Sequence, residues 1–110
     1  MRGCLKNIYM GETAAEMEKT IRRAIARGRS IPGLYLITFA SNGTDQLDIL
    51  HSQLLGQKRI REQLPPVVGF GIGREETLSL IPRIARDAFL ATGRCRLQEY
   101  LLSIQPEGAQ

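Results

Sequence analysis

The sequence predicts a small α/β domain, and two features of the chain support this fold class. Short apolar segments typical of strands alternate with segments in which apolar residues recur at helical spacing. Nearly charge-free strands are typical of sheets covered by helices on both faces, where helical connections favour parallel neighbours. We therefore expect one three-layer αβα domain with a mostly parallel sheet of three to four strands, in the order βαβαβα with an optional final strand.

The size and composition of the chain agree with a single folded unit. Its 110 residues fall within the usual range of one domain, and its 43% hydrophobic and 24% charged residues match ordinary globular proteins. We expect residues 1–105 to form the domain and residues 106–110 to form a loose C-terminal tail.

The first part of the chain is predicted to form two strands around one helix. Residues 5–10 and 33–40 are mostly apolar and rich in branched or aromatic side chains, as strands are. Between them, Thr13 and Glu16 have the spacing of a capping box at a helix start. Gly28 is suited to the left-handed residue that ends many helices, so the helix is expected to end there.

The rest of the chain is predicted to alternate in the same way. Leucines at helical spacing predict a second helix over 47–55, and the charge-free segment 67–73 predicts a third strand. A third helix is expected over 75–91, kinked but not ended by Pro82. Residues 94–104 fit either a short helix or an edge strand, and the strand is favoured.

Charge and residue counts limit the partners and the compartment. The net charge of +4 is spread evenly, with seven basic and five acidic residues in 1–55 and eight and six in 56–110, which disfavours nucleic-acid binding. Cys4, Cys95 and the single His51 suggest neither a disulfide framework nor a metal site. Without an apolar run long enough to span a bilayer or a signal-peptide core, we expect a cytoplasmic protein that does not contact membranes.

Three glycines, Gly69, Gly71 and Gly73, follow one another at alternate positions in and after the third predicted strand. They match neither the dinucleotide-binding fingerprint nor a P-loop, so no cofactor is expected. We interpret Gly69 and Gly71 as positions where a helix packs closely on the strand.

The candidate ligand site is the set of loops that follow the predicted strands. Ligands of open parallel sheets bind at the carboxyl ends of the strands, where helix-start amides and short polar side chains meet. The candidate ligand-binding residues are Glu12, Thr13, Ser41, Asn42, Thr44, Gly73 and Arg74. The acidic residues nearby favour a neutral polar or zwitterionic small molecule, with Arg74 meeting any carboxylate. The alternative interpretation is that these residues only cap helices.

No side chains have the pattern of a catalytic site, so the sequence favours a noncatalytic ligand- or protein-binding module. The alternatives are a small enzyme that acts on a polar small molecule at the strand-end loops, and a weak nucleic-acid binder. A homodimer is also expected, because the third helix carries more apolar residues than one contact with the sheet can cover. Leu80, Ile84 and Leu90 lie outside its main stripe of Leu78, Ile81, Ala85 and Phe89.

Overall fold

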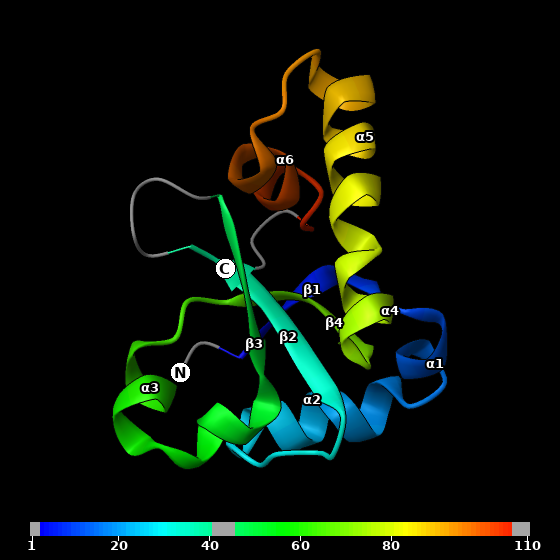
Figure 1. Cartoon of the computed structure of the whole chain (residues 1–110). Coiled ribbons are helices and arrows are strands. Elements are labelled where there is room, and N and C mark those ends of the chain that lie inside the picture. Colours follow the sequence, from blue (N-terminus) through cyan, green and yellow to red (C-terminus); the bar gives the residue numbers. More distant parts are fainter. Residues whose placement is uncertain (1–2, 41–45, 107–110) are drawn as a thin grey trace.

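A computed structural model describes residues 3–40 and 46–106 (Figure 1). The strands are β1 (Cys4–Met10), β2 (Leu34–Phe39), β3 (Leu47–His51) and β4 (Val67–Ile72). The helices are α1 (Glu12–Ala15), α2 (Glu18–Ala26), α3 (Lys58–Gln63), α4 (Arg74–Leu78), α5 (Leu80–Thr92) and α6 (Leu97–Ser103), with a 3₁₀ helix, η1, over Ser52–Gly56.

The four strands form one mixed sheet in the order β1-β4-β2-β3. β1 and β4 are parallel, whereas β2 is antiparallel to both β4 and β3. The α/β character is therefore confirmed, but the sheet is less parallel than predicted, because one of its three strand pairs is parallel. The order βαβαβα is also wrong, since β3 follows β2 as a hairpin rather than after a helix.

Residues 47–51 form a strand where the leucine spacing predicted a helix. β3 pairs with β2 in continuous antiparallel register, from Tyr35 opposite His51 to Phe39 opposite Leu47. Ile49 packs against one core cluster and Leu50 against the other, so successive side chains point to opposite faces as in a strand. Pairing with β2 thus outweighs the helical spacing, and helical turns begin only at η1.

Two core clusters cover the sheet, and the side chains of β2 alternate between them. Leu36 of β2 belongs to the first cluster and Ile37 to the second. The first cluster contains Ala14, Ile21, Ile25, Leu34, Leu36, Leu55, Leu64, Val67 and Phe70. The second contains Ile37, Val68, Leu80, Ile84, Ala88, Leu97, Tyr100 and Leu101. α1 and α2 therefore pack with the first cluster, and α5 and α6 with the second.

The predicted third helix is two helices that meet at Ser79. Pro82 falls in the first turn of α5, where its missing N–H costs no intrahelical bond, so the break precedes the proline instead of lying at it. Gly93 has a φ of 76° and ends α5 in the left-handed conformation. The buried face consists of Leu80, Ile84 and Ala88, whereas Phe89 of the predicted stripe is exposed. The hydrophobic face was thus assigned about one residue away from its true position.

Residues 97–103 form α6, not the favoured edge strand. Leu97, Tyr100 and Leu101 are buried at helical spacing against the second cluster, and burial of this stripe decides the element. The last described residue is Pro106, so 107–110 of the predicted tail lie outside the described residues. No helix within 3–40 and 46–106 is long and apolar enough to cross a membrane.

The first predicted helix is also divided. α1 ends at Ala15 and α2 begins at Glu18, and neither helix start has a side-chain cap hydrogen bond from its own N-cap residue. The capping box of Thr13 and Glu16 is therefore not formed. The predicted C-terminal end is confirmed, because Gly28 follows α2 with a φ of 67°.

Candidate functional site

The structure brings together two of the three loops predicted to form the ligand rim. Because β1 and β4 are parallel neighbours, the loops that follow them lie at the same end of the strands. Glu12 and Thr13 are therefore near Gly73 and Arg74. β2 runs in the opposite direction, and its first residue, Leu34, pairs with Ile72 at the end of β4. The carboxyl end of β2 therefore lies at the opposite end of the strands, away from this rim. Ser41, Asn42 and Thr44 follow that end and lie outside the described residues.

A carboxylate of the protein itself lies at the centre of this rim. Glu76 of α4 accepts hydrogen bonds from the backbone amides of Ile72 at 2.6 Å, Thr13 at 2.9 Å and Ala14 at 3.2 Å. These donors come from the end of β4 and the start of α1, so one side chain links both loops. Gly11 makes room for it, since a Cβ atom there would lie 2.2 Å from Cγ of Glu76.

The amides explain the charge state of Glu76. Burial alone would raise the pKa of this carboxyl, but the hydrogen bonds from Ile72, Thr13 and Ala14 together outweigh burial and hold its pKa below the ordinary value of 4.5. The carboxylate is thus ionised at neutral pH. It occupies helix-start donors that sequence analysis had assigned to a polar or zwitterionic small molecule.

A second polar cluster joins β1 to α5 and α6. The Tyr9 hydroxyl donates to Oδ2 of Asp87 at 2.6 Å and lies 2.8 Å from the hydroxyl of Tyr100. Arg86 contacts Oδ1 of Asp87 at 3.5 Å, and the guanidinium of Arg83 lies 5.8 Å from the centre of the Tyr9 ring. Sequence analysis missed this cluster, because Tyr9 and Asp87 are 78 residues apart and no local spacing relates them.

The titration behaviour of these groups is that of structural partners. Burial, followed by the hydrogen bonds to Asp87 and Tyr100, raises the pKa of Tyr9 far above its ordinary value. The hydrogen bond from Tyr9 lowers the pKa of Asp87, with the nearby arginines contributing. Burial also raises the pKa of the Cys4 thiol to about 11. At neutral pH, then, Tyr9 and Cys4 keep their protons and Asp87 is ionised, so none is activated as a nucleophile or base.

His51 has a local structural partner. Its Nδ1 accepts a hydrogen bond from the backbone amide of Gln53 at 2.9 Å, which caps η1. Its ring meets the Tyr35 ring edge-on, with centroids 4.9 Å apart. In the described parts of the chain, no group of three or more His, Cys, Asp and Glu side chains has the arrangement of a metal site.

The glycines of β4 accommodate close neighbours. A Cβ atom on Gly71 would lie 2.5 Å from Oγ1 of Thr77 and 3.0 Å from its backbone nitrogen, so α4 packs directly on the strand as predicted. At Gly69 the nearest atoms would belong to Tyr9 and Ile37 of the flanking strands. Gly69 therefore serves the sheet itself rather than a helix.

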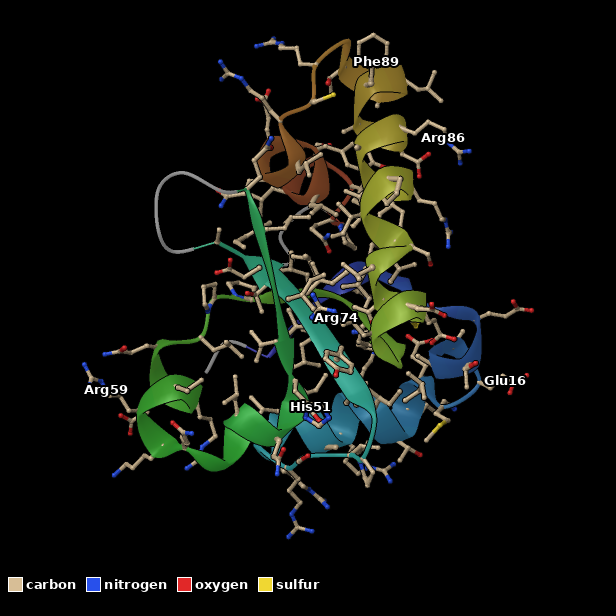
Figure 2. All side chains as sticks on the ribbon, in the orientation of Figure 1. Glu16, His51, Arg59, Arg74, Arg86 and Phe89 are labelled. Atoms are coloured by element: carbon tan, nitrogen blue, oxygen red, sulfur yellow. The ribbon has the colours of Figure 1, made fainter. Side chains whose placement is uncertain are left out.

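Among the described residues, the most exposed large apolar side chains lie near the end of α5. Phe89 is 56% exposed and Leu90 is 75% exposed. Figure 2 shows Phe89 at the upper end of this helix and Arg86 projecting outward from it. We define the α5 outer surface as Arg83, Arg86, Phe89, Leu90, Arg94 and Arg96, all of which are exposed. Arg86 lies three and four residues before Phe89 and Leu90, so the basic and apolar groups share one side of the helix.

Comparison with known proteins gives no match to a family model, a curated protein or a solved structure.

Proposed function

We propose that the protein is a noncatalytic protein-binding module whose α5 outer surface binds an acidic, partly apolar segment of another protein. The observation that carries the proposal is the exposure of two consecutive large apolar residues, Phe89 and Leu90, on a regular helix with arginines nearby. Single exposed apolar residues are common, but an aromatic residue with arginines around it is typical of the centres of protein interfaces.

The charge of the surface favours an acidic partner. From 83 to 99 the chain carries four arginines, and its acidic residues there are Asp87 and Glu99. The ionised Asp87 offsets part of the positive charge of Arg86, but four arginines against two acidic residues leave this segment with a net positive charge. A partner that places carboxylates near Arg86 and an apolar side chain on Phe89 would satisfy both features.

The titratable groups support a noncatalytic role. The perturbed carboxylates are each held by the fold, Glu76 by backbone amides and Asp87 by Tyr9. As part of the same proposal, we retain the three-layer arrangement, for which the two core clusters are the support. We also retain a cytoplasmic location, with which the free thiols of Cys4 and Cys95 agree.

The test uses a fluorescently labelled helical peptide that carries glutamate and leucine residues. The peptide is titrated with the protein, and binding is followed by fluorescence anisotropy. Arg86→Glu and Phe89→Ala should each weaken binding about tenfold, the effect of removing about 1.4 kcal/mol at an interface. Arg59→Glu is the matched control, because this exposed arginine of α3 lies far from α5 (Figure 2) and carries the same change in charge. A peptide with lysine in place of glutamate should not bind.

Two results would contradict the proposal. The first is equal loss of peptide affinity in the Arg59 and Arg86 variants, which would indicate a nonspecific effect of net charge. The second is submicromolar affinity for generic DNA or RNA at about 150 mM salt that Arg86→Glu removes, which would favour the nucleic-acid alternative.

A small-molecule site at the rim is a less favoured form of the binding role, because Glu76 already occupies the amides. If a thermal-shift screen finds a polar or zwitterionic ligand, Arg74→Ala should weaken its binding without lowering the melting temperature of the free protein. Arg74 is exposed and suited to this role. Unchanged ligand affinity in Arg74→Ala would reject the rim.

A further inference from the structure

The two edges of the sheet differ in how their backbone groups are satisfied. Along β1, the guanidinium of Arg22 donates to the carbonyls of Leu5 and Lys6 at 3.0 and 2.9 Å. The Gln105 amide accepts from the Asn7 backbone N–H at 2.8 Å and donates to its carbonyl at 2.7 Å. The side chains of Arg22 in α2 and of Gln105, which follows α6, therefore close this edge to another strand.

The other edge is β3, whose one strand neighbour among the described residues is β2. The amide of Ala40 donates to the Gln46 carbonyl at 3.1 Å, which identifies this pair as a hydrogen-bonded one. Such pairs alternate along an antiparallel ladder, so the backbone groups of Asp48 and Leu50 face β2. Those of Leu47 and Ile49 consequently point away from the sheet.

An independent contact between β2 and β4 agrees with this assignment of inward and outward backbone groups. The amide of Gly73 donates to the Gly33 carbonyl at 2.7 Å, so alternate residues of β2 from Gly33 onward direct their backbone groups toward β4. Leu36 and Thr38 are then left to bond β3, opposite Leu50 and Asp48. Contacts on both sides of β2 therefore agree that the backbone groups of Leu47 and Ile49 point away from the sheet.

β3 carries few of the features that usually protect an edge strand, and Asp48 is the one charged carboxylate in it. It contains no lysine and no proline, and its pairing with β2 has no bulge. All five of its residues are half-buried, including Leu47, Ile49 and Leu50, so apolar side chains remain partly accessible on both faces.

We propose that a second copy of this chain pairs with β3, strand to strand and antiparallel, to form a two-fold symmetric dimer with one continuous eight-stranded sheet. The symmetric register places Ile49 opposite Ile49 of the other copy, so that outward backbone groups meet outward groups. It places Leu47 opposite His51 and Asp48 opposite Leu50, with no like charges facing each other. This inference relocates the homodimer that the sequence predicted on the third helix, where Leu80 and Ile84 are buried, and it does not rest on the proposed function.

The test is the mass in solution by light scattering across a concentration series. The wild type should give twice the 12.3 kDa mass of the chain. Ile49→Pro removes an outward N–H that takes no part in the ladder with β2, so the variant should fold and give the monomer mass. Ile49→Ala is the matched control, since it shortens the same side chain but keeps the N–H, and it should remain dimeric at high concentration.

Folding of the variants is checked by circular dichroism and thermal melting. If Ile49→Pro does not fold, Leu47→Pro serves instead, because a proline at the first residue of an edge strand is well tolerated, and it should also be monomeric. A monomer mass for the wild type up to about 100 μM, where even weak complexes are populated, would overturn the proposal. So would a dimer that the proline variants leave intact and Leu90→Asp dissociates, since that result would assign the contact to α5.

Discussion

Replacing Glu76 with glutamine tests whether the rim is a structural link between two loops. The substitution keeps the shape of the side chain but removes its charge and presents an NH₂ group to at least one backbone donor. Hydrogen bonds to a charged acceptor are roughly twice as strong as neutral ones, with net contributions of about 1.5–3 kcal/mol against about 1 kcal/mol. The bonds from Ile72 and Ala14 are partly buried, whereas that from Thr13 is exposed.

Counting only the two partly buried bonds, Glu76→Gln should lower the free energy of unfolding by about 2 kcal/mol. The effect is measured by urea denaturation at neutral pH, with Glu75→Gln as the matched control. Glu75 is exposed in the same helical turn, and its replacement should change stability by less than about 0.5 kcal/mol.

The pH dependence supplies a second, independent readout. Because the pKa of Glu76 is lower in the folded protein, its contribution is fully present above the ordinary value of 4.5 and is lost as the pH falls through the folded pKa. The difference between wild type and Glu76→Gln should therefore shrink on acidification. A difference that grows at low pH, or equal stabilities of the Glu75 and Glu76 variants at neutral pH, would refute the assignment of Glu76 as the link.

Three further predictions concern packing and thiol chemistry. Gly71→Ala should destabilise the domain by at least about 2 kcal/mol in the same urea assay, because the new Cβ would meet the backbone of Thr77 at 3.0 Å. Gly56→Ala, whose Cβ would have no atom within 4 Å, should be nearly neutral. Equal effects of the two substitutions would contradict the close packing of α4 on β4. A maleimide reagent at pH 7 should label the exposed Cys95 well before Cys4, whose pKa is raised to about 11, and simultaneous labelling would show that β1 opens readily. Chelator and reductant should leave the melting temperature unchanged, and a fall of several degrees with either would reveal a metal or a disulfide that the sequence does not indicate.

The sequence predicted the elements whose burial is uniform. The nearly charge-free segments became β2 and β4, and a glycine with positive φ, Gly28, ended α2 as expected. In such segments the local pattern and the tertiary packing favour the same structure, so either one alone is informative.

Prediction failed where tertiary contacts decided between two local patterns. Leu47 and Leu50 fit a helix face, but they also fit the two faces of an edge strand, and only the pairing with β2 selects the strand. The direction of β2 is likewise a property of the whole sheet. Parallel neighbours were assumed from the sequence, and Asn42 was therefore placed on the same rim as Glu12. In the structure the carboxyl end of β2 lies at the opposite end of the strands.

The candidate site was predicted in part for a related reason. The helix-start amides near Thr13 were expected to meet a polar or zwitterionic ligand, but the group that binds them is Glu76, 63 residues later in the chain. No spacing rule relates residues so far apart. The exposed face of α5 was likewise not predicted. Nothing in the sequence indicated that one helix ends at Leu78 and another begins at Leu80, so the apolar stripe was assigned to one continuous helix.

The closure of β1 by distant side chains has a consequence for the order of folding. This strand is synthesised before every segment that it contacts, since its partner in the sheet begins at Val67 and the amide that covers Asn7 belongs to Gln105, 98 residues away. The β2–β3 hairpin, by contrast, needs only a short loop to form. Non-local pairings must first overcome the entropy of closing a long loop, so β1 is expected to join an existing β4-β2-β3 sheet late. A nascent chain that has not yet reached Gln105 therefore leaves the backbone groups of Asn7 in β1 uncovered, in addition to the open edge at β3. It is in this period of synthesis that the protein would be most in need of a chaperone.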